Sequence, residues 1–262
     1  SNCRSLLSAG TDAVAIFGKS WDLHVEKILG ATLEENLNMI RDTVSFFKDM
    51  GKEVVFDAEH FFDGYKNNPD YALLSLRAAC EGGADCLALC ETNGGAFPDE
   101  VYDIVKAVAK EVDVPLGIHC HNDSGCAAAN SIMAVKAGCV QVQGTYLGYG
   151  ERCGNANLST IIPGLQLKLG YDCIPKDNIL KLTRTARLIA EIANDPLYKG
   201  MPYVGRSAFS HKAGMHIDGV NKLPKSFEHI PPDSVGNERR FLMSEVAGRS
   251  TVLKKINKIA PE

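Results

Sequence analysis

The sequence lacks the features by which a membrane protein or a nucleic-acid-binding protein is identified. No apolar run reaches the roughly 18 residues that a membrane-spanning helix needs, and no signal-peptide pattern opens the chain. The formal net charge is −4 over 262 residues, and Lys and Arg are scattered rather than clustered on one helix. No basic field is therefore present to attract a phosphate backbone. We expect neither a membrane nor nucleic acid as a partner.

A disulfide framework is also missing, although the chain has nine cysteines. Their number is odd, no two form a C-x-x-C pair, and most stand singly inside apolar stretches, as Cys86, Cys90 and Cys139 do. This pattern is typical of buried thiols in a reducing compartment, and not of a secreted domain held by disulfides. It indicates a cytoplasmic protein.

The sequence has no G-x-G-x-x-G after an early strand, which is the fingerprint of a dinucleotide fold. It does have an alternation of short apolar runs with amphipathic stretches. The apolar runs predict strands at residues 12–18, 53–59, 86–95, 114–121 and 139–148. Helices are predicted after them at residues 32–51, 69–83, 98–112, 124–138 and 157–170. Five such βα units predict a parallel sheet covered by helices.

Two α/β architectures fit this alternation, a doubly wound open sheet and a (β/α)8 barrel. Polar residues stand at the C-terminal end of every predicted strand: Lys19, Ser20, Asp57, Glu59, Glu91, Thr92, Asn93, His119, His121, Gln143 and Thr145. A barrel builds its active site by bringing such strand ends to one mouth. A barrel needs eight strands, however, and only five are recognisable, so either three are missing or the sheet is open.

The character of the sequence changes after residue 170. A long helix is predicted at residues 176–194, and a loop-rich stretch that carries His211, His216 and His229 follows it. We therefore expect a partial barrel at residues 1–170 and a segment of helix and linker subdomains at residues 171–262.

The stretch "GIHCHNDSG", residues 117–125, places two histidines at the end of a predicted strand. Side chains alternate between faces along a strand, so His119 and His121 point the same way. They form half of a metal site, although two hydrogen-bonded histidines that only pack are an equal alternative. Asn155, in the glycine-rich turn after the last strand, can be aimed at the same place. Such a set suits Zn, Mn, Fe or Mg, and a cation there could polarise the ketone of a 2-oxo acid.

Four other residues are candidates for chemistry. Glu59 precedes two phenylalanines, and a carboxylate packed on aromatic rings has a raised pKa suited to an acid or base; the alternative is an ion pair with a lysine such as Lys66. Thr92, in "ETNGG", could hold a substrate carboxylate or cap a turn. His24 could bond a substrate or cap a loop. His216 lies in a glycine-flanked stretch, where a lid, a partner-subunit contact and plain surface are all open.

Several stretches together resemble the 2-isopropylmalate, homocitrate and citramalate synthases. They are "FDAEHFFDGYKNNPDYAL", "ETNGG", "PLGIHCHNDSG", "VQGTYLGYGERCGNANLSTIIPGLQLKLGY", "PYVGRSAFSHKAGMHIDGV" and "VGNERRFLMSEVAGR". Within that family, "DAEHFFDG" and "GYGERCGNANL" are most similar to the citramalate synthases. The resemblance implies an acyltransferase on a (β/α)8 barrel of the TIM-barrel type, of which about the last five βα units are present. It implies a metal-dependent Claisen condensation of acetyl-CoA with a 2-oxo acid, pyruvate first, followed by hydrolysis of the thioester.

The resemblance also implies roles for single residues and a homodimer. Metal binding falls to His119, His121 and Asn155, with Mn, Mg or Zn as the ion. Substrate binding falls to Thr92 and His24. The catalytic residues are Glu59 and His216, the latter contributed by the neighbouring subunit.

The sequence also departs from the family pattern, and these departures bear on the activity of the chain. The family's D-x-T-L-R-D-G motif, which supplies an arginine and a metal-binding aspartate, is not in these 262 residues. We expect three barrel strands to precede Ser1, and we expect the chain alone to be inactive for want of that arginine and aspartate. Phe227 stands where the family has a tyrosine. The alternatives are a 2-isopropylmalate or homocitrate synthase, a metal-dependent aldolase or lyase of the same barrel superfamily, and a non-catalytic remnant that binds a metal or a partner.

Overall fold

The computed structural model describes residues 2–212 and 214–242. The chain forms two compact units, the first ending at Asn157 and the second beginning at Leu158. The last part of the stretch "VGNERRFLMSEVAGR" and the end of the predicted segment 171–262 lie outside the described residues.

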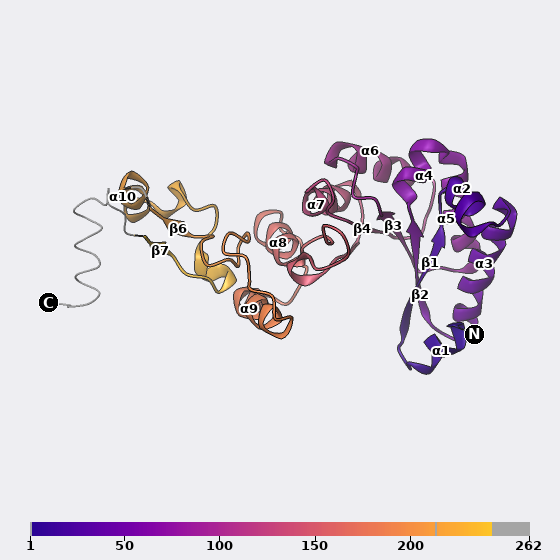
Figure 1. Ribbon diagram of the computed structural model, residues 1–262, viewed down its shortest axis with the longest axis horizontal. Helices are drawn as coiled ribbons and strands as arrows, with labels where there is room; N and C mark the ends of the chain where they lie inside the picture. Colours follow the sequence, from indigo (N-terminus) through magenta and orange to yellow (C-terminus); the bar gives the residue numbers. More distant parts are fainter. Residues whose placement is uncertain (1, 213, 243–262) are drawn as a thin grey trace. The chain divides into compact units, whose positions relative to one another are not determined.

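The first unit is built on one parallel sheet of five strands (Figure 1). These are β1 (Ala13–Lys19), β2 (Glu53–Glu59), β3 (Cys86–Glu91), β4 (Leu116–Cys120) and β5 (Gln141–Gln143). The spatial order β1-β2-β3-β4-β5 is the order in the chain, and every neighbouring pair is parallel. A doubly wound sheet reverses its strand order at a switch point, whereas a barrel adds strands in one direction. The sheet is therefore of the barrel type, which confirms the predicted fold class.

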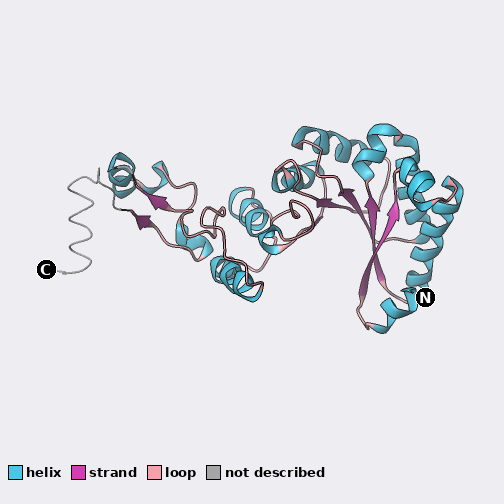
Figure 2. Ribbon diagram, in the orientation of Figure 1, coloured by secondary structure: helices cyan, strands magenta, loops and turns pink. Residues whose placement is uncertain are grey.

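The helices that connect the strands of this unit lie along one face of the sheet (Figure 2). They are α3 (Leu33–Asp49), α4 (Phe61–Asn67), α5 (Pro69–Gly82), α6 (Pro98–Val108) and α7 (Ala127–Ala137). Right-handed crossovers that always step in the same direction place these helices on the same side. Thr32 caps α3 by accepting a hydrogen bond from the Glu35 N–H at 3.1 Å, and Asn68 caps α5 in the same way. Large apolar side chains such as Phe47 and Phe56 are fully buried in this unit.

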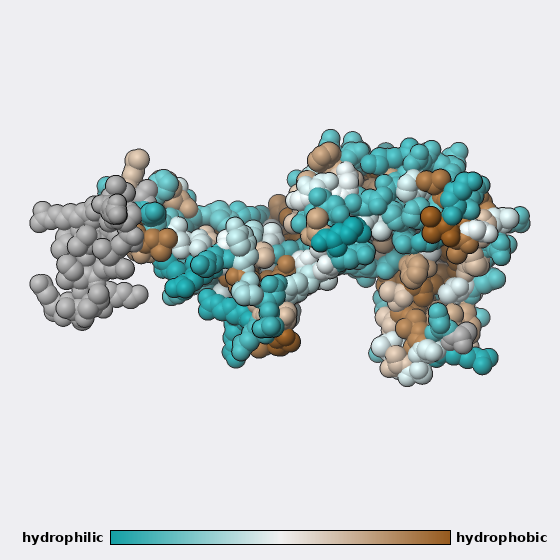
Figure 3. Space-filling view, viewed as in Figure 1, coloured by the Kyte–Doolittle hydropathy of each residue, from teal (hydrophilic) through white to brown (hydrophobic). Residues whose placement is uncertain are grey.

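The opposite face of the sheet carries the side chains that a closed barrel would enclose. Along β1, Val14 is buried, whereas Phe17, on the other face, is 72% exposed. Figure 3 shows hydrophobic surface along β1 and β2. The open face of the sheet is therefore apolar along β1 and β2 and polar at the C-terminal ends of the strands.

Several parts of the first unit differ from the prediction, among them the short helices α1 (Asn2–Ser8) and α2 (Asp22–His24), which were not expected. The fifth strand was expected over residues 139–148, but β5 ends at Gln143 because the chain turns into a short 3₁₀ helix, Tyr146–Gly148, with Leu147 at φ 67°. Helix α4 was not expected, because "FFDGYKN" is short and contains a glycine. It starts after His60, whose φ of 55° turns the chain sharply from β2 into the helix.

The second unit has short elements. They are α8 (Leu158–Pro163), α9 (Leu182–Ile192), α10 (Gly214–Lys222), β6 (Ser210–His211), β7 (Arg240–Phe241) and the turns η3 (Gly164–Lys168), η4 (Lys176–Lys181), η5 (Pro224–Ser226) and η6 (Pro232–Val235). The predicted helix 176–194 is thus a 3₁₀ turn followed by the shorter α9. All nine cysteines are unpaired, as expected. Across residues 2–212 and 214–242, no helix combines the length and the apolarity needed to cross a bilayer.

Helix α4 packs closely on the turn after β1, and this contact gives a test of the fold. A Cβ on Gly64 would lie 2.4 Å from the Ser20 carbonyl oxygen and 3.0 Å from the Trp21 Cα. We expect Gly64→Ala to destabilise the protein by about 1–3 kcal/mol, because overpacking against backbone outweighs the roughly 1 kcal/mol that alanine adds to a helix. Urea unfolding measures the difference. Gly95→Ala is the control, since no atom lies within 4 Å of its Cβ position; equal unfolding midpoints for the two variants would contradict the packing.

Candidate active site

The carboxyl ends of the strands bring the two predicted metal-binding histidines together. His119 lies near the end of β4, and His121 follows it two residues on; their ring centroids are 5.2 Å apart. Rings that bind one ion through nitrogens at about 2.1 Å, with a tetrahedral angle between them, have centroids about 5 Å apart. The spacing of the two rings therefore fits a shared cation.

A chain of hydrogen bonds holds the His119 ring. The His119 Nδ1 lies 2.9 Å from the Gln143 Oε1, and the Gln143 Nε2 donates to the Asp57 Oδ1 at 2.7 Å. Burial raises the pKa of Asp57, while the hydrogen bond from Gln143 opposes the change. His119 is thus oriented by a neighbouring strand and, through Gln143, by the more distant β2.

His121 and Asn155 meet in an isolated antiparallel bridge, and each has an unsatisfied atom. The His121 Nδ1 and the Asn155 Oδ1 are both buried without a hydrogen-bond partner, while the Asn155 Nδ2 donates to the Tyr149 carbonyl at 3.2 Å. Burial, with the nearby His119 and Arg152, lowers the pKa of His121, which favours the neutral form that binds metals.

Two ring nitrogens and an amide oxygen fit a divalent cation as part of its ligand shell. In the described part of the chain, no group of three or more His, Cys, Asp and Glu side chains gathers around an ion site. Metal binding by His119, His121 and Asn155 therefore stays a prediction that the geometry favours.

Glu59 forms an ion pair, but not with the lysine that was named as its alternative partner. Its Oε2 meets the Nζ of Lys19, the residue opposite it in the β1–β2 register. Lys66 instead contacts Glu100, at 3.4 Å. Glu59 therefore has a lysine partner other than the example named, because the parallel register, which the sequence does not state, decides which lysine faces it. The role of Glu59 as an acid or base stays a prediction.

His24 belongs to a small cluster of rings beside this ion pair. Its ring stacks on Trp21 with centroids 4.9 Å apart and lies 4.1 Å from the His60 ring. Burial, and then the nearby His60, lowers the pKa of His24, and its Nδ1 is buried without a partner. Thr92 joins the cluster because its Oγ1 accepts a hydrogen bond from the His60 N–H at 2.8 Å. Its hydroxyl proton therefore remains available to donate to another group.

Arg152 is a residue of this edge that sequence reasoning missed. It makes a bidentate ion pair with Asp123, through Nε at 2.9 Å and Nη2 at 3.0 Å, and its Nη2 also donates to the Thr92 carbonyl at 2.7 Å. One guanidinium thus ties together the loops after β3, β4 and β5. Nothing in "GERCGN" signals these contacts, because they join residues up to 60 positions apart.

His216 lies in the second unit, on α10. Its side chain is exposed, and its ring lies 4.4 Å from the ring of Phe227. The residue that departs from the family's tyrosine is thus the aromatic neighbour of His216. The predicted role of His216 in a partner subunit stays a prediction.

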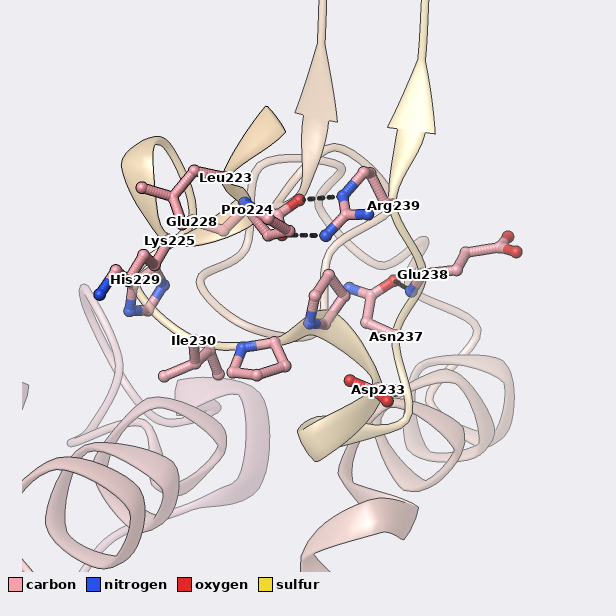
Figure 4. Close-up of a pocket in the computed structure, with 12 residues that line it drawn as sticks. Leu223, Pro224, Lys225, Glu228, His229, Ile230, Asp233, Asn237, Glu238 and Arg239 are labelled. Carbon is pink, nitrogen blue, oxygen red and sulfur yellow. Dashed lines mark hydrogen bonds and ion pairs between the residues drawn. The ribbon is translucent and has the colours of Figure 1, made fainter. Parts of the chain in front are cut away.

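The second unit has a cavity of about 690 Å³ (Figure 4). Its lining includes Glu228, which is almost completely buried and accepts hydrogen bonds from the Arg239 Nε and Nη2 at 2.6 and 2.5 Å. The His211 Nε2 lies 3.1 Å from the same carboxylate. The Arg239 guanidinium, with help from His211, holds the pKa of Glu228 below its usual value.

This ion pair predicts how the stability of the second unit depends on pH. The pKa of Glu228 in the folded protein lies below its usual 4.5, so the unfolded chain takes up the proton first. Its contribution is complete above pH 4.5 and is lost as the pH falls towards the folded value. We expect Glu228→Gln to cost about 2 kcal/mol at pH 7 and less at pH 3.5, as measured by urea unfolding.

The matched control for this experiment is Glu238→Gln, because Glu238 pairs with Arg240 at the surface and is 66% exposed. We expect its effect to stay below about 0.5 kcal/mol at both pH values. The ion pair would have no such role if Glu228→Gln and Glu238→Gln changed the stability equally.

Comparison with known proteins covers nearly the whole chain. A family described as HMGL-like matches residues 2–189, and one described as homocitrate synthase post-HMGL domain-like matches residues 203–260. An (R)-citramalate synthase of Aquifex aeolicus is 57% identical over 259 residues, which are 98% of this chain and 49% of that protein. A probable 2-isopropylmalate synthase of Methanopyrus kandleri is 36% identical over 256 residues, 98% of this chain and 50% of that protein.

A solved structure of similar fold is the HMG-CoA lyase of Bacillus subtilis, with a TM-score of 0.64 and 21% identity, covering 74% of this chain and 68% of that one. The chain spans about half the length of the citramalate synthases that it matches. These findings confirm the resemblance that the motifs indicated.

Proposed function

The chain belongs to the HMGL-like family, and on that premise we propose that the protein condenses acetyl-CoA with a 2-oxo acid. The oxo acid is pyruvate, the product is citramalate, and a water molecule hydrolyses the thioester to release CoA. The observation that carries this proposal is the 57% identity to the (R)-citramalate synthase of Aquifex aeolicus, sustained over 259 residues. The lower identity of 36% to a probable 2-isopropylmalate synthase supports pyruvate over a larger oxo acid.

The proposed metal ligands are His119, His121 and Asn155, which offer two ring nitrogens and an unsatisfied amide oxygen. A divalent ion held there, Mn, Mg or Zn, would polarise the ketone of the oxo acid. The Thr92 hydroxyl accepts a hydrogen bond from the His60 N–H, and it would donate a hydrogen bond to the carboxylate of the oxo acid. His24 would line the same pocket, with its partnerless Nδ1 as a further hydrogen-bonding group.

Glu59 is proposed as the acid–base residue that exchanges a proton with the methyl group of acetyl-CoA. Its ion pair with Lys19 fixes the carboxylate in one orientation at the end of β2. His216, contributed by the second chain of a homodimer, would be its companion. The exposure of His216 on α10 is compatible with contact to a second subunit.

The 262 residues contain no D-x-T-L-R-D-G motif, so the oxyanion-stabilising arginine and the metal-binding aspartate of the family pattern have no counterpart in them. We therefore propose that this chain by itself turns over little or no substrate. A 2-isopropylmalate or homocitrate synthase would share the same chemistry with a larger oxo acid. An aldolase or lyase would run in the cleavage direction, and a remnant would bind a metal without turnover.

The proposed reaction is tested by release of thiol from acetyl-CoA with Mn²⁺ and each of pyruvate, 2-oxobutyrate, 2-oxoisovalerate and 2-oxoglutarate. Two proteins are compared: the 262-residue chain, and the same chain preceded by a family segment that carries the D-x-T-L-R-D-G motif. We expect release only from the extended protein and the largest kcat/KM with pyruvate. A preference for 2-oxoisovalerate would favour a 2-isopropylmalate synthase. If the extended protein turned over none of the oxo acids, the synthase hypothesis would be rejected.

The role of Glu59 is tested in the extended protein by Glu59→Gln. We expect kcat to fall by about 10²–10⁴-fold with a smaller change in KM, because the amide cannot carry the proton. Glu100→Gln is the matched control, since Glu100 is a glutamate paired with a lysine at the surface and lies on α6, not on a strand. Equal kcat values in the two variants would remove Glu59 from the mechanism.

A further inference from the structure

The hydrogen bonds of Gln143 have a direction that constrains His119. An ionised Asp57 can only accept hydrogen bonds, so the Gln143 amide turns its NH₂ towards Asp57 and its oxygen towards His119. The Gln143 oxygen is an acceptor, and the His119 Nδ1 facing it must therefore carry the proton. A neutral imidazole has one N–H, so the Nε2 of His119 keeps a free lone pair.

We propose that Gln143 and Asp57 are positioning residues that hold His119 as the Nδ1–H tautomer, so that its Nε2 is available to a divalent cation. The inference rests on the proposed function, because it takes His119 as a metal ligand. Metal-binding histidines donate their second ring N–H to an oxygen in this way, and the donor–acceptor contact fixes both tautomer and ring orientation.

The arrangement is specific because Asp57 and Gln143 come from strands that are not neighbours. In a flat sheet, β2 and β5 would be about 14 Å apart, since two strands separate them. An extended Asp and Gln with a hydrogen bond between them span only about 11 Å. The 2.7 Å contact therefore requires the sheet to curl towards its open face.

The two strands between them leave room for this contact. Asp57 lies opposite Ala88 in the β2–β3 register, and Cys90, two residues on, lies opposite His119. Both β3 residues are short, and Gly117 of β4, opposite Ala88, has no side chain. The longer side chains from β2 and β5 therefore meet above them. The contact also excludes a simple packing role for Gln143, because both ends of its amide are engaged by polar groups.

The first test replaces Gln143 in the full chain and compares it with a matched control. Gln143→Leu removes the amide, and Gln141→Leu changes the same residue type two positions earlier on the same strand, where its side chain contacts Cys86 and not a histidine. The tautomer of His119 is read in metal-free protein from the ¹⁵N shifts of its ring. Zn²⁺ affinity is measured by competition with a chelating dye, and a ¹H–¹⁵N spectrum confirms that each variant is folded.

We expect Gln143→Leu to shift His119 towards the Nε2–H tautomer and to weaken Zn²⁺ binding about 10–100-fold, while Gln141→Leu changes neither. An unchanged tautomer in Gln143→Leu overturns the proposal. If wild type binds Zn²⁺ no better than His119→Ala does, the metal site of the proposed function has failed. Failure of the metal site can be distinguished from failure of the tautomer proposal, because the tautomer of His119 is measured in metal-free protein.

A second pair of variants tests the direction of the hydrogen bonds. Asp57→Asn allows the Gln143 amide to turn either way, and we expect a mixture of His119 tautomers. The double variant Asp57→Asn, Gln143→Glu places a carboxylate beside His119 and an NH₂ opposite it, which again requires Nδ1–H. We expect it to restore the wild-type tautomer. If the double variant shows the same mixture of His119 tautomers as Asp57→Asn does, the proposed direction of the hydrogen bonds from His119 through Gln143 to Asp57 is overturned.

Discussion

The site depends on the curvature of the sheet. The hydrogen bond between Asp57 and Gln143 can form only because the sheet is curved. Parallel strands added in one direction twist and curl, and this brings the ends of β2 and β5 close enough for side-chain contact. His119, on β4 beside β5, is drawn into the same chain by the Gln143 oxygen. Without this curvature, the polar ends of the strands would form a row and not a site.

The loops after the strands are joined to one another by polar contacts. Arg152 binds Asp123 and the Thr92 carbonyl, and the His60 N–H donates to the Thr92 hydroxyl. These contacts leave few degrees of freedom to the side chains that face the edge. Buried atoms without hydrogen-bond partners, the His121 Nδ1 and the Asn155 Oδ1 among them, lie at the same edge. Because buried polar atoms are usually paired, these atoms are what the proposed metal site rests on.

The second unit has few regular elements, and a buried ion pair supports it. Glu228 is surrounded by Arg239 and His211, which come from different segments, so the three side chains hold the loop-rich region in one arrangement. His216 and Phe227 lie on neighbouring elements of the same unit. Part of the second unit, residues 203–260, matches a family described as homocitrate synthase post-HMGL domain-like, and its first residues belong to the HMGL-like match that ends at residue 189.

The sequence by itself determined the βα alternation and the pairing of His119 with His121, because strand and helix periodicity are local properties that a few neighbouring residues reveal. From periodicity alone the barrel and the doubly wound sheet stayed open; the family resemblance indicated the barrel, and the strand order confirmed it. The sequence also indicated Asn155 and Thr92, through motifs in turns. It did not reveal α4, the early end of β5, or the identity of Glu59's partner. Those outcomes depend on register and on positive φ values at single residues such as His60 and Leu147.

Only the tertiary structure decided how the strand ends meet. Asp57 and Gln143 are 86 residues apart, and no local pattern states that one will orient the other's amide. The same holds for Arg152, whose contacts lie 29 and 60 positions away. The physical reason is that hydrogen bonds between side chains depend on distances set by the curvature of the whole sheet, whereas secondary structure depends on the chain within a few residues.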